Sequence, residues 1–247
     1  MFANSKLLDQ LKSVRWSPYN GASVILTHAG FQHDFADVDR SADIKVIAPH
    51  HVKQIHSNII LKATAESSFQ NERRPEGDGI FSLEKGVKIA IKTADCLPIL
   101  VATKNKTFAA AVHAGWRGFT SGILARAITM ANQYDTPENI LVVTGPAISR
   151  DQFEVGEDVV AAVFSDQAGL TQESQMLVTS KGQLDRWHVD LPLASACVAI
   201  HLGILPANIE IIQSCTKAAL SQGKNLHNSY RRDGKGCGSN WSWISIS

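Results

Sequence analysis

Side chains able to hold a metal ion occur on two neighbouring segments of the chain. Residues 86–103 and 106–113 read as the two strands of a β-hairpin, joined by a polar two-residue turn. With that turn, Cys96 lies directly opposite His113. Opposed residues have Cβ atoms about 4.5–5.5 Å apart. A thiolate and an imidazole at these positions are therefore close enough to share one ion.

A third candidate ligand is His56, which precedes a short apolar segment. One cysteine and two histidines leave the fourth position of a tetrahedral zinc open, a pattern typical of catalytic rather than structural zinc. Such an ion lowers the pKa of a bound water to about 7. The spacing is equally compatible with a buried cysteine beside ordinary histidines. It also fits a nucleophilic Cys96 with His113 as its base.

Composition narrows the class of protein. The 247-residue chain has a formal net charge of +1 and no block of like charge, so neither nucleic acid nor an anionic membrane is indicated as a partner. No apolar run is long enough for a membrane span, and the first residues lack the apolar core of a signal peptide. The four cysteines are widely spaced, which favours reduced thiols. We expect a cytoplasmic protein.

The order of expected elements predicts the fold class. Strands and helices alternate irregularly and include a hairpin, which favours a mixed sheet flanked by helices. We therefore expect a single α/β (α+β) domain over residues 1–247, with layered mixed sheets. The segments are strands at 21–27, 45–48, 141–144 and 209–215, a polar loop at 65–79, a helix at 119–133, and a helix that begins after Asp190 and ends at Gly203.

Seven short strings occur in a fixed order along the chain. They are Gln54-x-His56, Asp78-Gly79, Thr93-Ala-Asp-Cys-Leu-Pro98, His113-Ala-Gly-Trp-Arg-Gly118, Gly145-Pro-Ala-Ile148, Phe153-Glu-Val-Gly156 and Ser229-Tyr-Arg-Arg-Asp-Gly234. Together they resemble the YfiH family, also called the multicopper polyphenol oxidase or laccase-domain family. Its members include bacterial purine nucleoside phosphorylases. The resemblance extends from about residue 45 to about residue 238.

The resemblance implies a fold, a metal and a reaction. It implies a layered α/β domain in which His56, Cys96 and His113 bind zinc. The implied activity is phosphorolysis of adenosine, inosine, guanosine and methylthioadenosine, with a zinc-dependent adenosine deaminase activity beside it. The partners would be a purine nucleoside and phosphate, and the protein a monomer or weak homo-oligomer. Copper and a laccase-like oxidation of phenols are the alternative, although none of the nine histidines forms a His-x-His pair.

The chain also departs from the family's usual strings. His28 stands where members usually carry an arginine near the first strand, and Cys237 replaces an arginine that usually follows Arg-Arg-Asp-Gly. The lost arginines are of the type that contacts an anionic substrate group. The affinity for phosphate or the range of substrates is therefore expected to differ.

Four charged residues are candidates for the remaining roles. Arg117 and Arg232 are expected to bind phosphate or substrate, because each lies in a turn within one of the strings, Arg117 near the start of a helix where anions are favoured. Asp78 is the candidate carboxylate for proton transfer during deamination. Asp95 is expected to be structural, because its side chain would point to the face opposite to that of Cys96 on a regular strand.

Overall fold

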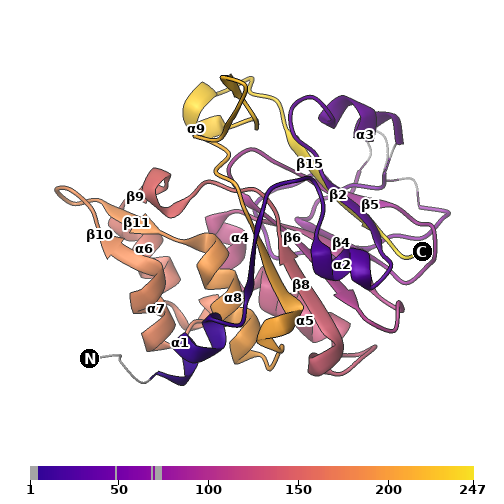
Figure 1. Ribbon diagram of the computed structural model, residues 1–247, viewed down its shortest axis with the longest axis horizontal. Helices are drawn as coiled ribbons and strands as arrows, with labels where there is room; N and C mark the ends of the chain where they lie inside the picture. Colours follow the sequence, from indigo (N-terminus) through magenta and orange to yellow (C-terminus); the bar gives the residue numbers. More distant parts are fainter. Residues whose placement is uncertain (1–4, 48, 68, 70–73) are drawn as a thin grey trace.

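The computed structural model describes residues 5–47, 49–67, 69 and 74–247 (Figure 1). A seven-stranded mixed sheet forms its centre. In spatial order its strands are β1 (Arg15–Pro18), β12 (Ile209–Gln213), β8 (Ile140–Thr144), β6 (Leu97–Thr103), β7 (Ala109–Ala114), β4 (Gly79–Ser82) and β3 (Ile60–Lys62). β1, β12 and β8 run parallel, β6 and β7 form an antiparallel hairpin, and β3 runs parallel to β4.

Both faces of this sheet are covered. Helices α5 (Ile123–Ala131) and α8 (Leu191–His201) pack on one face. On the other face lies an antiparallel sheet in the order β2 (Gln32–Phe35), β15 (Asn240–Ser245) and β5 (Ile89–Thr93). Side chains of β6 point alternately to the two faces of the sheet. Leu97, Ile99 and Val101 pack against the helices, and Leu100 and Ala102 pack between the two sheets. The result is a three-layered mixed α/β fold, as the sequence predicts.

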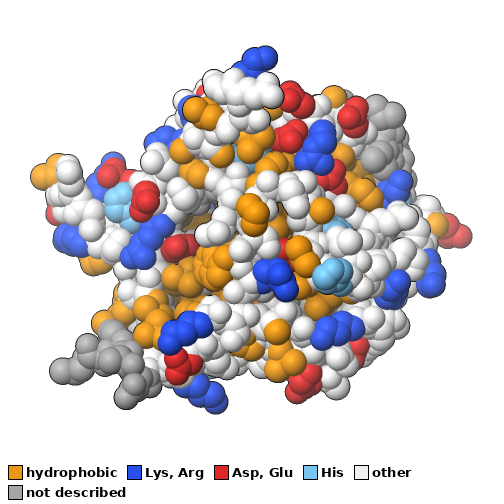
Figure 2. Space-filling model, in the orientation of Figure 1, with side chains coloured by type: hydrophobic (Ala, Val, Ile, Leu, Met, Phe, Trp, Pro, Cys, Tyr) orange, Lys and Arg blue, Asp and Glu red, His pale blue; other side chains and the backbone are white. Residues whose placement is uncertain are grey.

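The other elements surround these layers. Two small sheets consist of β10 (Thr179–Lys181), β11 (Trp187–Val189) and β9 (Glu154–Val155), and of β13 (Leu220–Ser221) and β14 (Lys224–Asn225). The remaining helices are α1 (Lys6–Leu11), α2 (Val24–His28), α3 (Ser41–Ile47), α4 (Trp116–Thr120), α6 (Glu157–Val163), α7 (Gln172–Val178) and α9 (Tyr230–Asp233). Within the described ranges no helix combines the length and apolar character needed to cross a membrane. Basic and acidic side chains are interspersed on the face in Figure 2.

The predicted single strand over 86–103 is wrong. The segment forms two strands in different sheets, β5 and β6, separated by a bend. Asp95 makes this bend, with a φ of 89° in the left-handed region. The predicted pairing is also wrong, because His113 faces Pro98 and not Cys96. Residues 104–107 form a longer turn than expected, closed by a hydrogen bond from the Thr103 amide to the Phe108 carbonyl, and this shifts the register by two.

The predicted strand at 21–27 is also wrong, because residues 24–28 form helix α2. Ser23 caps this helix by accepting a hydrogen bond from the Leu26 amide. The buried carboxylate of Glu210, from the distant strand β12, accepts hydrogen bonds from the amides of Val24 and Ile25. A carboxylate at a helix N-terminus stabilises the helix. Because Glu210 is distant in sequence, the residues around 21–28 do not predict this contact.

Three further predictions need correction. In the predicted strand at 45–48, residues 45–47 belong to helix α3, and residue 48 lies outside the described part. The single helix predicted over 119–133 is divided into α4 and α5 at Gly122, whose φ is 80°. In the loop predicted at 65–79, Gly79 instead opens β4, and residues 68 and 70–73 lie outside the described part.

Three other elements are confirmed. The strands predicted at 141–144 and 209–215 correspond to β8 and β12. Helix α8 begins where predicted, because the side chain of Asp190 accepts a hydrogen bond from the Leu193 amide. The helix ends two residues before Gly203, whose φ of 87° suits a glycine.

Candidate metal centre and its cavity

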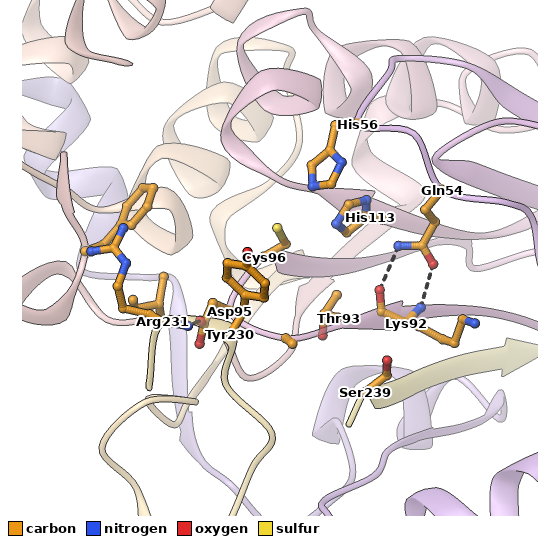
Figure 3. Close-up of a pocket in the computed structure, with 13 residues that line it drawn as sticks. Gln54, His56, Lys92, Thr93, Asp95, Cys96, His113, Tyr230, Arg231 and Ser239 are labelled. Carbon is orange, nitrogen blue, oxygen red and sulfur yellow. Dashed lines mark hydrogen bonds between the residues drawn. The ribbon is translucent and has the colours of Figure 1, made fainter. Parts of the chain in front are cut away.

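His56, Cys96 and His113 converge at one point. Their nitrogen and sulfur ligand atoms all lie within 4.8 Å of one another. His56 comes from the segment before β3, Cys96 from the bend between β5 and β6, and His113 from β7. Figure 3 shows the three side chains pointing towards one another. The two imidazole rings are 4.9 Å apart between centroids and nearly perpendicular, with an interplanar angle of 76°.

A single carboxylate, that of Asp78, holds two of these ligands. Its side chain is fully buried, and Oδ1 lies 2.8 Å from Nδ1 of His113. A carboxylate only accepts, so Nδ1 of His113 carries a hydrogen, and in the neutral ring Nε2 is the nitrogen whose lone pair can bind an ion. Asp78 also accepts hydrogen bonds from the amides of Ile55, His56 and Ser57 and from the Ser57 hydroxyl. These bonds hold His56 at a positive φ of 61°.

Asp78 therefore differs from the freely placed proton carrier that the sequence predicts. Both of its oxygens are already used within the protein, so the geometry makes it a positioning residue. Although burial alone would raise the pKa of Asp78, hydrogen bonds from His113 and Ser57 lower that pKa to about 2. The carboxylate is thus ionised, as a partner of the His113 ring should be.

Cys96 and His113 influence each other's ionisation. Burial favours the neutral thiol, but the hydrogen bonds and charges of His113 and His56 lower the pKa of Cys96 to about 7. Burial disfavours imidazolium, but Asp78 and Cys96 raise the pKa of His113 to about 9. The thiolate is consequently accessible near neutral pH, which is the form that binds a soft metal ion or acts as a nucleophile.

Gly115 leaves room for this cluster. It is the N-cap of α4, and a Cβ atom at this position would lie 2.9 Å from Cδ2 of His56 and 3.0 Å from Sγ of Cys96. Any larger residue would displace the ligands. One thiolate and two imidazoles, one of them with a fixed tautomer, suit a zinc ion with an open fourth position, and nitrogen and sulfur donors also suit copper. The residues present therefore fit the metal that the resemblance implies.

The cluster lies in the wall of a cavity of about 520 Å³, a size within the usual range for small-molecule sites. The Gln54 side chain ties one wall together, because its amide exchanges hydrogen bonds of 2.7 and 2.9 Å with the backbone of Lys92 (Figure 3). The cavity is lined by Gln54, His56, Lys92, Thr93, Ala94, Asp95, Cys96, His113, Ile148, Phe153, Tyr230, Arg231 and Ser239.

Comparison with known proteins identifies the family. The family model described as multi-copper polyphenol oxidoreductase laccase matches residues 28–247. The chain belongs to this family. The protein named purine nucleoside phosphorylase YfiH of Shigella flexneri is 35% identical over 163 residues, 64% of this chain and 64% of that protein. The protein named adenosine deaminase RL5, from an unknown prokaryotic organism, is 34% identical over 151 residues, 60% of this chain and 56% of that protein.

The aligned regions thus span less than two thirds of either relative's length. A solved structure supports the fold independently. The crystal structure of a Neisseria meningitidis protein superposes with a TM-score of 0.70 at 28% identity, covering 85% of this chain and 79% of that chain.

Neither arginine singled out from the sequence of this laccase-domain protein lines the cavity. Arg117 is exposed, and its guanidinium carbon lies 4.2 Å from the ring centroid of Trp116. Arg232 donates hydrogen bonds to the backbone carbonyls of Thr216, Lys217 and His227 and pairs with Asp233 at 2.7 Å. These contacts hold the loop around α9, and the substrate-binding role of Arg232 stays a prediction. His28 and Cys237 also lie outside the cavity lining.

Sequence reasoning missed several residues of the cavity, although the family strings contain most of them. Phe153, Ile148, Tyr230 and Arg231 all line it, and each lies within one of the seven strings. The signal was therefore the clustering of the strings around one site. Choosing between two adjacent arginines requires the direction of each side chain, which the string does not give.

Proposed function

We propose that this protein is a zinc-dependent purine nucleoside phosphorylase that also deaminates adenosine. Its substrates would be adenosine, inosine, guanosine and methylthioadenosine, with phosphate as co-substrate. The observation that carries the proposal is the group formed by His56, Cys96 and His113 in the wall of a nucleoside-sized cavity. The names of the two relatives point to the same pair of reactions.

The roles of the protein's own side chains follow from their positions. His56, Cys96 and His113 would hold the zinc ion, which supplies a Lewis acid with an open position when it is bound. Asp78 holds a hydrogen on Nδ1 of His113 through its 2.8 Å contact, so that Nε2 is the nitrogen that faces the cluster and would give up its proton to bind the ion. Its bonds to the backbone around His56 keep that ring in place without help from the substrate.

Phosphorolysis requires the cavity to orient phosphate and nucleoside and to stabilise the charges that develop during the reaction. An oxygen of phosphate forms a bond to C1′ of the ribose while the C1′–N9 bond breaks and its electron pair leaves with the purine, which takes up a proton. Positive charge builds on the ribose and negative charge on the base, so orientation and fixed charges supply most of the acceleration. The cavity contributes an aromatic ring, Tyr230, and cationic side chains, Lys92 and Arg231, to these tasks.

A cysteine hydrolase is the second candidate. It is favoured by the lowered pKa of Cys96, about 7, beside an imidazole held by a buried carboxylate. A copper-dependent oxidation of phenols has less support. Multicopper oxidases use several histidine-rich sites, and the described part of the chain brings one three-ligand group together.

Elemental analysis combined with a purine-release assay tests the proposal. Purified protein should contain about one zinc per chain, and base release from inosine should require phosphate. Ammonia release from adenosine should not require phosphate. Base release that is independent of phosphate, or full activity in protein depleted of metal, would reject the zinc phosphorylase in favour of a hydrolase.

A further inference from the structure

The guanidinium of Arg231 belongs to the cavity. Helix α9 presents this exposed side chain at the cavity wall, where its guanidinium carbon lies 5.5 Å from the ring centroid of Phe153. One N–H group donates to the carbonyl of Glu154 at 3.0 Å. No carboxylate oxygen of the described residues lies within 4.0 Å of this guanidinium. The positive charge is therefore held in place without being neutralised.

The backbone of Arg231 is fixed relative to the metal ligands. Its amide donates a 2.6 Å hydrogen bond to Oδ2 of Asp95, the residue immediately before Cys96. The other oxygen of Asp95 accepts a hydrogen bond of 2.6 Å from the hydroxyl of Thr216. Because the link to Asp95 uses the backbone amide, a change of the Arg231 side chain leaves it intact.

Figure 3 draws the guanidinium end of Arg231 on the other side of Tyr230 from the rings of His56 and His113. In Figure 3 the Arg231 side chain extends away from His56 and His113, and the Tyr230 ring stands between them. Tyr230 is about half exposed, at 54%, and lines the same cavity. A planar base stacked on Tyr230 with its amino-bearing edge at the metal ligands, as deamination requires, would carry its ribose towards Arg231.

We propose that Arg231 binds the phosphate co-substrate, on the side of Tyr230 opposite to the metal ligands. The proposal rests on the phosphorylase function proposed above and assigns its anion subsite. Apart from the bond to Glu154, the described residues leave the guanidinium N–H groups unpaired, so these can form a charge-assisted fork with phosphate oxygens. The contact with Phe153 reduces the freedom lost on binding. Arg231 compensates the charge of the phosphate and takes no part in bond formation at C1′.

The assignment separates the two proposed reactions. Phosphorolysis needs the Arg231 subsite, whereas deamination consumes water and needs no phosphate. A change at Arg231 should therefore affect phosphorolysis far more than deamination. Arg117 provides a matched control, because it is also an exposed arginine stacked on an aromatic ring but lies outside the cavity lining.

Kinetics of three variants test the assignment. Arg231→Gln should raise the KM for phosphate in inosine phosphorolysis roughly 10- to 100-fold, the usual effect of losing charge-assisted hydrogen bonds. Arg231→Lys keeps the positive charge but cannot form two parallel hydrogen bonds, so its KM for phosphate should lie between those of Arg231→Gln and the wild type. Arg117→Gln should match the wild type, and all three variants should keep adenosine deamination within about twofold. Deamination also reports that each variant is folded.

The outcomes distinguish this proposal from the proposed function. Wild-type protein that releases no base in the presence of phosphate removes both the phosphorylase function and the subsite. Phosphorolysis with an unchanged KM for phosphate in Arg231→Gln removes the subsite alone. Equal losses of phosphorolysis and deamination in Arg231→Gln and Arg231→Lys would mean that Arg231 binds the nucleoside or supports the wall, which also overturns the assignment.

Discussion

Nδ1 of His113 lies 2.8 Å from Oδ1 of Asp78, and both groups are buried. This contact decides which nitrogen of the His113 ring is available to an ion. The same carboxylate accepts the amide hydrogen of His56 at 2.9 Å, so one buried side chain organises two of the three candidate ligands. The ligand cluster is therefore built by the fold before any ion binds.

Replacement of Asp78 tests this organisation. An asparagine at this position would turn one acceptor oxygen into an N–H₂ donor facing other N–H groups. We expect Asp78→Asn to weaken zinc binding about 10- to 100-fold, the usual effect of losing the partner of a metal-bound histidine. Competition with a zinc-binding dye measures this affinity. Asp190→Asn, at the N-cap of α8, is the control, and equal zinc affinity in both variants would contradict the role given to Asp78.

Gly115→Ala tests the close packing of the ligands. An alanine Cβ would lie 2.9 Å from His56 and 3.0 Å from Cys96, while the backbone φ of −63° is ordinary for alanine. Zinc affinity and turnover should fall on the order of 10-fold or more, because small displacements in a site are costly. The thermal midpoint should change little.

The control for this variant is another glycine N-cap. Gly156 precedes α6 with a φ of −85°, and its added Cβ would meet the carboxylate end of the Asp158 side chain at 2.8 Å. Since that side chain can move, Gly156→Ala should keep zinc and activity. If Gly115→Ala behaves in the same way, the cluster is looser than its geometry indicates.

Cys96→Ser tests the thiolate ligand. The variant should lose most of its zinc and nearly all turnover while it keeps its fold, because Cys96 lies at the cavity wall in a bend before β6. Cys237→Ser, at a partly exposed thiol outside the cavity lining, should behave as wild type. An inactive Cys96→Ser protein that retains its zinc would instead support Cys96 as a nucleophile.

The buried ring of His227 predicts a loss of stability in acid. Its pKa is lowered from 6.5 to about 4, mainly by burial, with Asp37 opposing this and Arg232 and Arg40 adding to it. Between about pH 6.5 and about pH 4, His227 is protonated in the unfolded chain but neutral in the folded protein. The free energy of unfolding therefore falls as the pH drops through this range.

Urea unfolding at pH 7 and pH 5 measures this contribution. Wild-type protein should lose about 2 kcal/mol through His227 between these values. His227→Gln, which has no titrating ring, should lose correspondingly less. Identical losses in both proteins would show that His227 does not titrate as its burial indicates.

The fold class could be predicted from the sequence because it depends on local apolar runs. Strand β8 and helix α8 were recognisable from such a run and from the cap at Asp190. Helix α2 was not, because its N-terminus is stabilised by Glu210 from another part of the chain. The bend at Asp95 also depends on distant partners, Thr216 and Arg231, that local sequence does not identify.

The site was predictable in its residues but less so in its geometry. Cys96 and His113 do meet, although the pairing that predicted the meeting is wrong by two residues. The role of Asp78 depends on its burial and on the three loop amides that donate hydrogen bonds to it. An Asp-Gly pair in the sequence predicts a turn and not these contacts. His56 is a candidate third ligand from its residue type, and the family strings are what single it out from the other histidines.

The most direct test of the central claim is a zinc titration of metal-depleted wild-type protein, followed by phosphate-dependent base release from inosine. If His56, Cys96 and His113 hold a zinc ion that the reaction requires, activity should rise in proportion to added zinc and level off at about one equivalent per chain. Full activity before any zinc is added, with metal absent by elemental analysis, would contradict the account.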